Sequence, residues 1–507
     1  MSHHAATGPA AAGGPGGRRE TGLRGTLGTG QVALMVVAAA APLAVVSAPA
    51  PLAVALGNGP GAAGTFLLVA AAMLLFTVSM SALAPYVRSS GAFYAYVGHG
   101  LGPVPGLAAA GVSWLTYTVI QWCVCAYLGV QCDAVVRLLG GPDGPWWLYT
   151  LLGVAVIAVL GHLRIDLSAR VLGAALALEV GGVLAVDLGV LVQGGAEGIH
   201  ATGFTPGAVF PGGSAFAVSA MLCATAFLGF ETTAVFRDEA RDPDRTVPRA
   251  TYLAICFIGL FYALSTWLVC LAWPGGELAR VSVQGAPFLL GAARGFVGGT
   301  LSDILQVLLT TSLFACALSL HNVLARYDHV LARSGVLPAA LGRVHRRHAS
   351  PYVASAFTAL VTLAAFGVMV PLGLDPVTGI VAPGNGLAAL GFLVLLCLTC
   401  LSALVFFARA GTGGRPWRTR VWPAFGFLAL AALAAVTYRH FPALVGKDPA
   451  VAHALAAAFP LAALAGAARA GWLRRRRPER YARVLALTGG AATGHGPTAG
   501  PGPPGGR

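Results

Sequence analysis

The sequence has very little charge for its length. Only 10% of its 507 residues are Asp, Glu, Lys or Arg, and 57% are hydrophobic. A typical soluble domain is about one quarter charged, and no water-soluble fold buries so much apolar surface. The apolar stretches recur along the whole chain, which excludes a soluble enzyme carrying one membrane anchor. The composition therefore predicts an integral membrane protein.

Sequence signatures of catalysis are also missing. The chain has no Gly-x-x-x-x-Gly-Lys phosphate loop, no His-Glu-x-x-His zinc site and no convincing metal-ligand cluster. We therefore expect neither an enzyme nor an ATP-driven pump, and no cofactor or metal. Rings of pore charges and a repeated filter are absent too, which disfavours a channel. Cys397-x-x-Cys400 lies within an apolar run, so we interpret it as small apolar filler rather than a redox pair.

Lysine is almost absent, because Lys447 is the sole lysine among 32 basic residues. These residues lie in short segments between apolar runs and in the cluster Arg474 to Arg477, which favours anionic lipid headgroups over nucleic acid as the partner. With the N terminus in the cytoplasm, nearly all basic residues fall on the cytoplasmic side; the exceptions are Arg137, Arg280, Arg294, Arg439 and Lys447. The positive-inside rule then predicts a plasma (inner) membrane protein with both termini cytoplasmic.

The long apolar runs define the expected helices, since about twenty apolar residues are needed to cross the hydrocarbon core. We predict twelve spans, at 31–56, 64–86, 104–130, 146–163, 170–193, 213–236, 250–273, 302–325, 352–373, 384–408, 422–438 and 450–472. The segment 91–101 is too short and too polar to cross, and it is interpreted as an interfacial or re-entrant turn.

Two of these spans are irregular. The first contains Pro42, Pro49 and Pro51, which remove backbone donors and clash with preceding carbonyl groups. The sixth is interrupted by Gly229 and Glu231. Interruptions at matching places, five helices apart, are typical of an inverted-repeat transporter with a substrate site at the membrane midplane. The alternative is a pair of ordinary packing kinks.

Three motifs make the chain resemble the amino acid–polyamine–organocation (APC) superfamily. They are Gly229-Phe230-Glu231 with the acidic, Pro-bearing segment 237–249; Asn322-x-x-x-Arg326 with 332–338 and Ser350-Pro351; and 89–97 with Leu101-Gly102-Pro103. The resemblance spans about residues 31–410. It implies an all-α polytopic fold of about twelve transmembrane helices, built as a five-plus-five inverted repeat with discontinuous helices 1 and 6 and two appended C-terminal helices.

The resemblance also implies a division of the chain. We expect a disordered cytoplasmic N-terminal tail over 1–30 and an inverted-repeat core of ten helices over 31–410. Helices 11 and 12 would occupy 411–473, and a basic, Gly/Pro-rich cytoplasmic tail 474–507. Family members are often monomeric, and a monomer is favoured here.

In this family a substrate cavity lies between the broken first and sixth helices, walled by the third and eighth. Carried onto this sequence, the substrate-binding residues are Ser47, Ala48, Pro49, Ala50, Tyr117, Phe227, Gly229 and Phe230, with Trp122 as a further aromatic candidate. Relatives usually have a Gly-rich first break whose amides hold the substrate carboxylate. Here the stretch is Ser-Ala-Pro-Ala-Pro, which offers fewer N–H groups and puts an α-amino acid substrate in question.

Glu179, in the fifth span, stands about where some proton-coupled relatives place a lysine, so it is the predicted coupling residue; the alternative is a buried structural hydrogen-bond donor. Asp187, two turns further, lies roughly 80° round the helix and need not share that face. Thr311 and Ser312 offer a weaker signal for sodium, and His321 is interpreted as a packing residue. The predicted gating or structural residues are Glu231, Glu239, Arg241, Asp242 and Arg326.

The resulting prediction is a secondary active transporter of amino acids, coupled to protons in symport and working by alternating access. A polyamine or other organic-amine permease or exchanger is the alternative within transporters. A sensor that has the transporter fold but moves nothing is the alternative of a different class, because fold does not fix function.

Overall fold

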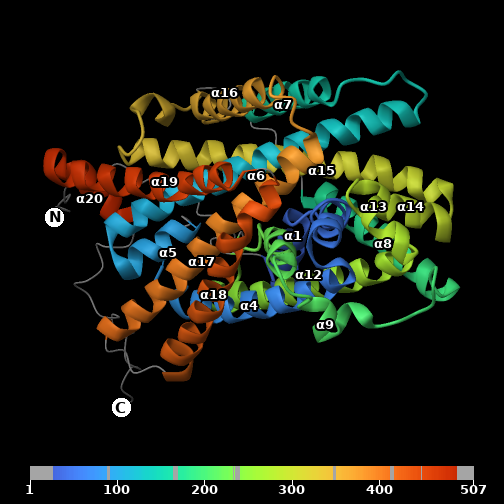
Figure 1. Cartoon of the computed structure of the whole chain (residues 1–507). Helices are drawn as coiled ribbons and strands as arrows, with labels where there is room; N and C mark the ends of the chain where they lie inside the picture. Colours follow the sequence, from blue (N-terminus) through green and yellow to red (C-terminus); the bar gives the residue numbers. More distant parts are fainter. Residues whose placement is uncertain are drawn as a thin grey trace, which may run out of the picture.

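The computed structural model describes residues 27–87, 92–163, 169–231, 233, 240–345, 350–410, 416–446 and 448–487. Helices joined by turns and short loops make up this part, and the only pairing of extended backbone within it is an isolated parallel bridge between Leu27 and Ala240. Figure 1 shows α1 near the centre of the bundle, with α7 and α16 side by side along one edge.

The elements of the first half are α1 Thr29–Ala39, α2 Pro42–Ser47, α3 Pro49–Leu52, η1 Ala53–Asn58, η2 Gly59–Gly61, α4 Ala62–Leu83, α5 Ala92–Leu101, α6 Pro103–Leu138, α7 Trp146–His162, α8 Ala169–Gln193, η3 Thr202–Phe204, α9 Pro206–Val209 and α10 Ala215–Thr225. Those of the second half are α12 Pro243–Leu271, α13 Gly275–Ser282, α14 Ala286–Phe296, α15 Gly299–Arg333, η5 Ala339–Gly342, α16 Tyr352–Met369, η6 Pro376–Val381, α17 Ala382–Ala410, η7 Trp417–Val421, α18 Trp422–Val445, α19 Pro449–Arg476 and α20 Pro478–Leu487.

The predicted spans all coincide with helical segments. Ten helical stretches within the described ranges are long and apolar enough to cross a membrane. Two shorter apolar helices, α7 and α10, fall on the fourth and sixth predicted spans. The all-α polytopic fold class is therefore confirmed.

The first span is broken twice, each time at the residue before a proline. Ala41, before Pro42, has left-handed backbone angles (φ 46°, ψ 68°), and Ala48, before Pro49, has φ −137° and ψ −73°. A proline disfavours helical backbone in the residue that precedes it, which explains both positions. The predicted discontinuity is confirmed: Pro42, Pro49 and Pro51 were all named as interruptions, although we expected the loss of helix around Pro49 and Pro51 and the structure shows a further break at Ala41.

The sixth span is broken where the sequence predicted. Helix α10 ends at Thr225, and the chain continues as turns through Glu231. Gly229 has φ 111°, a backbone conformation that residues with a Cβ atom rarely adopt. Thr232 and the segment 234–239 lie outside the described residues.

Segment 91–101 is not the turn that we predicted. Residues 92–101 form helix α5, which buries Phe93, Tyr94 and Tyr96 and packs against α6 and α17. The Ser402 hydroxyl of α17 donates to the carbonyl of Tyr96 (2.6 Å) and accepts from the N–H of Gly100 (3.1 Å). Its three buried aromatic rings make this short helix part of the core.

The C-terminal helices α19 and α20 pack against the ends of α6 and α15. The Arg469 guanidinium of α19 donates from Nε to the Val336 carbonyl (2.8 Å) and from Nη2 to the Gly335 carbonyl (3.0 Å), just beyond the end of α15. Val484 of α20 is fully buried in a small apolar cluster with Leu107. Part of the segment assigned to a tail is thus helical and packed, because α20 has an apolar face.

Helices α6 and α19 approach each other backbone to backbone. A Cβ atom on Gly111 would lie 2.3 Å from the carbonyl oxygen of Ala462, and one on Gly466 would lie 2.2 Å from that of Leu107. Small residues at such contacts let transmembrane helices approach closely, and the resulting packing drives their association.

We expect Gly111→Val to destabilise the protein by about 1–3 kcal/mol or more, since the added atoms collide with backbone rather than with a movable side chain. Thermal unfolding of the purified protein, followed by size-exclusion chromatography, measures the effect. Gly181→Val on α8 is the matched control, because nothing lies within 4 Å of a Cβ atom at Gly181. Equal stability of the two variants would contradict the role of this contact.

Candidate functional site

The carbonyl groups at both breaks of the first span have tyrosine partners. The Tyr262 hydroxyl of α12 donates to the Ala40 carbonyl (3.3 Å), beside the break at Ala41. The Tyr127 hydroxyl of α6 donates to the Ser47 carbonyl, beside the break at Ala48. Ser47, Ala48 and Ala50 are buried in this region. Two tyrosines thus hold the broken helix against its neighbours, and the sequence analysis had singled out neither.

Glu179 of α8 lies beside the start of α2. Its side chain is 6% exposed, and its carboxyl group interacts with the Ser312 hydroxyl of α15 and with the backbone of Leu43. Its Oε2 atom has no hydrogen-bond partner within the described ranges. Of the two hydroxyls considered for sodium, only Ser312 faces this carboxyl; Thr311 is exposed and donates to its own helix.

Glu231 joins the sixth-helix break to α6. Its Oε2 atom accepts from the backbone N–H of Gly229 (2.9 Å), and its Oε1 atom accepts from the Tyr117 hydroxyl. The carboxyl group is 3% exposed, so both bonds are shielded from solvent. The buried carboxyl group of Glu231 therefore binds both the unwound backbone of the sixth span and the Tyr117 side chain of the third span.

The phenylalanines of the sixth break pack into the core. Phe227 lies edge-on to Tyr262, at 6.5 Å between ring centroids, which links the sixth break to the tyrosine that holds Ala40. Phe230 packs between Phe76 of α4 (5.6 Å) and Phe392 of α17 (6.0 Å). Both phenylalanines are fully buried, so in this conformation neither ring faces an open cavity.

The other polar residues of the fifth and eighth spans are paired outside this region. Asp187 accepts from the Ser265 hydroxyl (2.6 Å), which joins α8 to α12. The Nε2 atom of His321 lies 2.8 Å from the hydroxyl oxygen of Ser355 on α16. His321 is therefore placed as a packing residue.

Of the predicted gating or structural residues, Glu231 is buried at the sixth break, whereas Arg241, Asp242 and Arg326 lie at the surface. The backbone N–H of Arg241 donates to the Leu27 carbonyl (3.1 Å), which ties the loop before α12 to the segment before α1. Asp242 pairs with Arg245 at 3.7 Å, an exposed contact that contributes little stability. Arg326 is exposed on α15. Glu239 lies outside the described residues.

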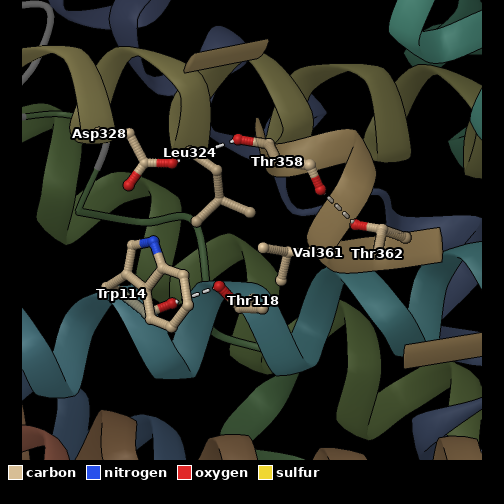
Figure 2. A pocket seen from close by; sticks show the side chains of 7 residues that line it. All are labelled: Trp114, Thr118, Leu324, Asp328, Thr358, Val361 and Thr362. Atoms are coloured by element: carbon tan, nitrogen blue, oxygen red, sulfur yellow. Dashed lines mark hydrogen bonds between the residues drawn. The ribbon is translucent and has the colours of Figure 1, made fainter. Parts of the chain in front are cut away.

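A further buried acid, Asp328, was missed. Figure 2 shows it on α15 beside Trp114 of α6 and Thr358 of α16, in a space too narrow for a water molecule. Thr358 donates to its Oδ2 atom (3.4 Å), and the Trp114 side chain is also a partner. The signal was present in the sequence as an acid two residues after Arg326, but its burial depends on α6 and α16.

A second missed residue is Gln121, one turn along α6 from Tyr117. Its Nε2 atom donates to the Cys125 sulfur (3.4 Å), and its Oε1 atom is buried with no partner among the described residues. No group of three or more His, Cys, Asp or Glu side chains that could hold a metal ion occurs in that part of the chain either. The polar groups near the two breaks are thus carboxyl, amide and hydroxyl groups.

Known proteins similar to this chain are membrane permeases. It is 26% identical to the low-affinity putrescine importer PlaP of Escherichia coli (strain K12) over 296 residues, 56% of this chain and 62% of the importer. It is 25% identical to the branched-chain amino acid permease BcaP of Bacillus subtilis (strain 168), over 62% of this chain and 68% of the permease. It is 24% identical to the lysine-specific permease LysP of Lactococcus lactis subsp. cremoris (strain MG1363), over 60% and 62%.

The family comparison covers more of the chain than these relatives do. The sequence model described as amino acid permease matches residues 44–479, which include the break at Ala48 and the break of the sixth span but not the break at Ala41. That family consists of membrane transporters and not of enzymes. On a match of this extent, the chain belongs to the amino acid permease family.

Proposed function

We propose that this protein is a secondary active transporter that carries amino acids or related amines across the plasma membrane, driven by a proton gradient and working by alternating access. The observation that carries the proposal is the contact between Glu179 and the start of α2, where the first span is broken. A titratable group placed at that break experiences a different environment whenever the break moves.

The free-energy cost of a buried negative charge is the reason we assign Glu179 a role in coupling transport to protons. A carboxylate inside a membrane protein costs several kcal/mol unless it is paired or protonated. Glu179 has one hydroxyl partner, one backbone partner and an open Oε2 atom, and no basic side chain is among its contacts. A proton bound at Glu179 would offset that cost, and its release would accompany a rearrangement of the break.

The breaks of the first and sixth spans are the segments that would move during transport. Tyr262 contacts the break at Ala41 and the sixth break, since its hydroxyl donates to the Ala40 carbonyl and its ring packs on Phe227. Movement of one break is therefore communicated to the other. Alternating access would follow if the half-helices rock against the surrounding helices, as in inverted-repeat transporters.

The relatives support the solute class, because their names specify putrescine, branched-chain amino acids and lysine. All of these are small compounds with at least one amino group. The arginine-rich segments support cytoplasmic termini, with Arg474, Arg475 and Arg476 at the end of α19 facing anionic headgroups.

Uptake by the purified full-length protein in liposomes tests the proposal. The probes are radiolabelled leucine, lysine and 1,4-diaminobutane, with the outside more acidic than the inside. We expect at least one probe to accumulate inside and to leak out again when a protonophore dissipates the gradient. An acidic exterior traps amines outside, so passive diffusion cannot produce this result.

Two outcomes would contradict the proposal. Equal uptake with and without the gradient would exclude proton coupling. No uptake or exchange of any probe would exclude this solute class and would favour a sensor with a transporter fold.

A further inference from the structure

We infer that the transported solute is a small organic cation with an ammonium group and no carboxylate, and that the side-chain oxygen of Gln121 accepts a hydrogen bond from that ammonium. The inference rests on the proposed transport function and narrows its solute class. Three features carry it: the sign of the buried charges, the occupation of the backbone amides at the breaks, and the one open amide oxygen beside them.

The buried ionisable groups are almost all acids. Among the described residues, the carboxyl groups of Glu179, Asp187, Glu231 and Asp328 are buried, and no Lys or Arg side chain is. The one buried histidine, His321, is engaged with Ser355. Of these acids, Glu179 and Glu231 contact the breaks, so an ammonium entering there would have a carboxyl group to pair with when that group is ionised, whereas a carboxylate would meet no buried Lys or Arg side chain among the described residues.

Few backbone donors remain at the first-span breaks. Pro42, Pro49 and Pro51 carry no N–H group. The backbone of Leu43, beside the first break, is already engaged by Glu179. Proline and the carboxyl group of Glu179 thus remove or occupy most of the N–H groups with which the N-termini of α2 and α3 would hold a solute carboxylate.

At the sixth-span break, the N–H groups from Ala226 to Phe230 are all engaged. The N–H groups of Ala226, Phe227, Leu228 and Phe230 donate to the carbonyls of Cys223, Ala224, Thr225 and Phe227 at 3.0–3.3 Å. The remaining one, on Gly229, donates to Glu231. A solute carboxylate would have to displace the carboxyl group of Glu231 to reach an amide here.

Gln121 offers a hydrogen-bond acceptor one helical turn from the contact between α6 and the sixth break. It follows Tyr117 by four residues on α6, so the two side chains share one face of the helix, and Tyr117 contacts Glu231 at the sixth break. The Gln121 amide nitrogen is held by Cys125, which leaves the oxygen open. Cys125 is an electrostatic neighbour of Cys316, which in turn neighbours Glu179. Gln121 therefore lies on the side of α6 that faces the acidic interior.

The first test compares solutes that differ only in the carboxylate. Initial uptake into liposomes with a more acidic exterior, after subtraction of uptake into protein-free liposomes, is measured for leucine against 3-methylbutylamine, and for lysine against 1,5-diaminopentane. We expect each amine to be taken up at least tenfold faster than its amino acid at equal concentration. Equal or faster uptake of the amino acids would overturn the inference and leave the proposed transport function standing. No uptake of any of the four would overturn both.

The second test concerns Gln121. Gln121→Leu is expected to weaken binding of the preferred amine at least tenfold, because the acceptor is lost, while Gln121→Glu is expected to keep or strengthen it. A carboxylate solute would give the opposite result, since Gln121→Glu would repel it. Scintillation proximity binding to the purified protein measures both.

Gln131→Leu is the matched control on the same helix. The oxygen of Gln131 already accepts from Gln306 of α15 (2.9 Å), so this change removes a structural bond and should leave the preference between amine and amino acid unaltered. Folding of each variant is checked by size-exclusion chromatography. Undiminished amine binding by folded Gln121→Leu, or its loss in Gln121→Glu, would overturn the role of Gln121.

Discussion

Replacing Glu179 with glutamine is expected to abolish accumulation of solute driven by a proton gradient while preserving exchange of solute across the membrane. Glutamine keeps the size of the side chain and its ability to bond Ser312 and the backbone of Leu43, but it cannot bind or release a proton. Without that step the gradient no longer drives net uptake. Counterflow of labelled against unlabelled solute in liposomes separates exchange from accumulation.

Asp187→Asn is the matched control for this prediction. Asp187 is also a buried carboxyl group on α8, but it is bonded to Ser265, away from the first break. We expect Asp187→Asn to retain gradient-driven uptake. Gradient-driven uptake by Glu179→Gln at the level of the unaltered protein would show that Glu179 is a structural residue. Loss of both accumulation and exchange in a folded Glu179→Gln protein would show that its role extends beyond the proton.

Removing the Tyr117 hydroxyl is expected to slow transport about tenfold or more. In Tyr117→Phe the Oε1 atom of Glu231 loses its partner in a buried environment, which costs about 1–3 kcal/mol. The loss destabilises those conformations in which Tyr117 of the third span contacts Glu231 at the sixth break. Because each 1.4 kcal/mol is about a tenfold change in an equilibrium, the balance between conformations should shift by one to two orders of magnitude. Initial uptake rates over a range of solute concentrations measure the effect.

Tyr327→Phe is the comparison for Tyr117→Phe. Tyr327 of α15 also donates its hydroxyl to α6, but to the backbone carbonyl of Ala110 (3.0 Å). We expect its removal to change transport much less, since Ala110 lies outside both breaks. If Tyr117→Phe transports at the rate of the unaltered protein, the bond to Glu231 does not control the motion of the break.

The sequence predicted the helical segments well because the hydrocarbon core imposes a minimum length on every span. The sixth break could also be predicted from the sequence, since Gly229 and Glu231 interrupt an otherwise apolar run. The break at Ala41 was only partly predicted, because Pro42 was named as an interruption but alanine itself favours helix. For segment 92–101 the sequence suggested a turn, and contacts with α6 and α17 made it a helix instead.

The site was harder to predict than the fold. A sequence shows that Gln121, Asp328 and Tyr262 are polar or aromatic, but not which of their atoms find partners. Those partners come from helices far away in the chain: Ala40 for Tyr262, and Trp114 and Thr358 for Asp328. Phe230 illustrates the same limit, since two distant rings decide that it packs into the core in this conformation.

The backbone contact between α6 and α19 also constrains how the protein is made. The ribosome delivers the Gly111 face of α6 to the membrane long before Gly466 and Ala462 exist. Until α19 is inserted, that face is covered by lipid, and the carbonyl groups of Gly335 and Val336 lack the Arg469 guanidinium that binds them in the finished protein. The third and eighth spans therefore acquire their final packing only after the last membrane helix is synthesised. Premature termination between Glu231 and Arg469 would leave a chain that contains the breaks of the first and sixth spans but lacks the contacts made by α19.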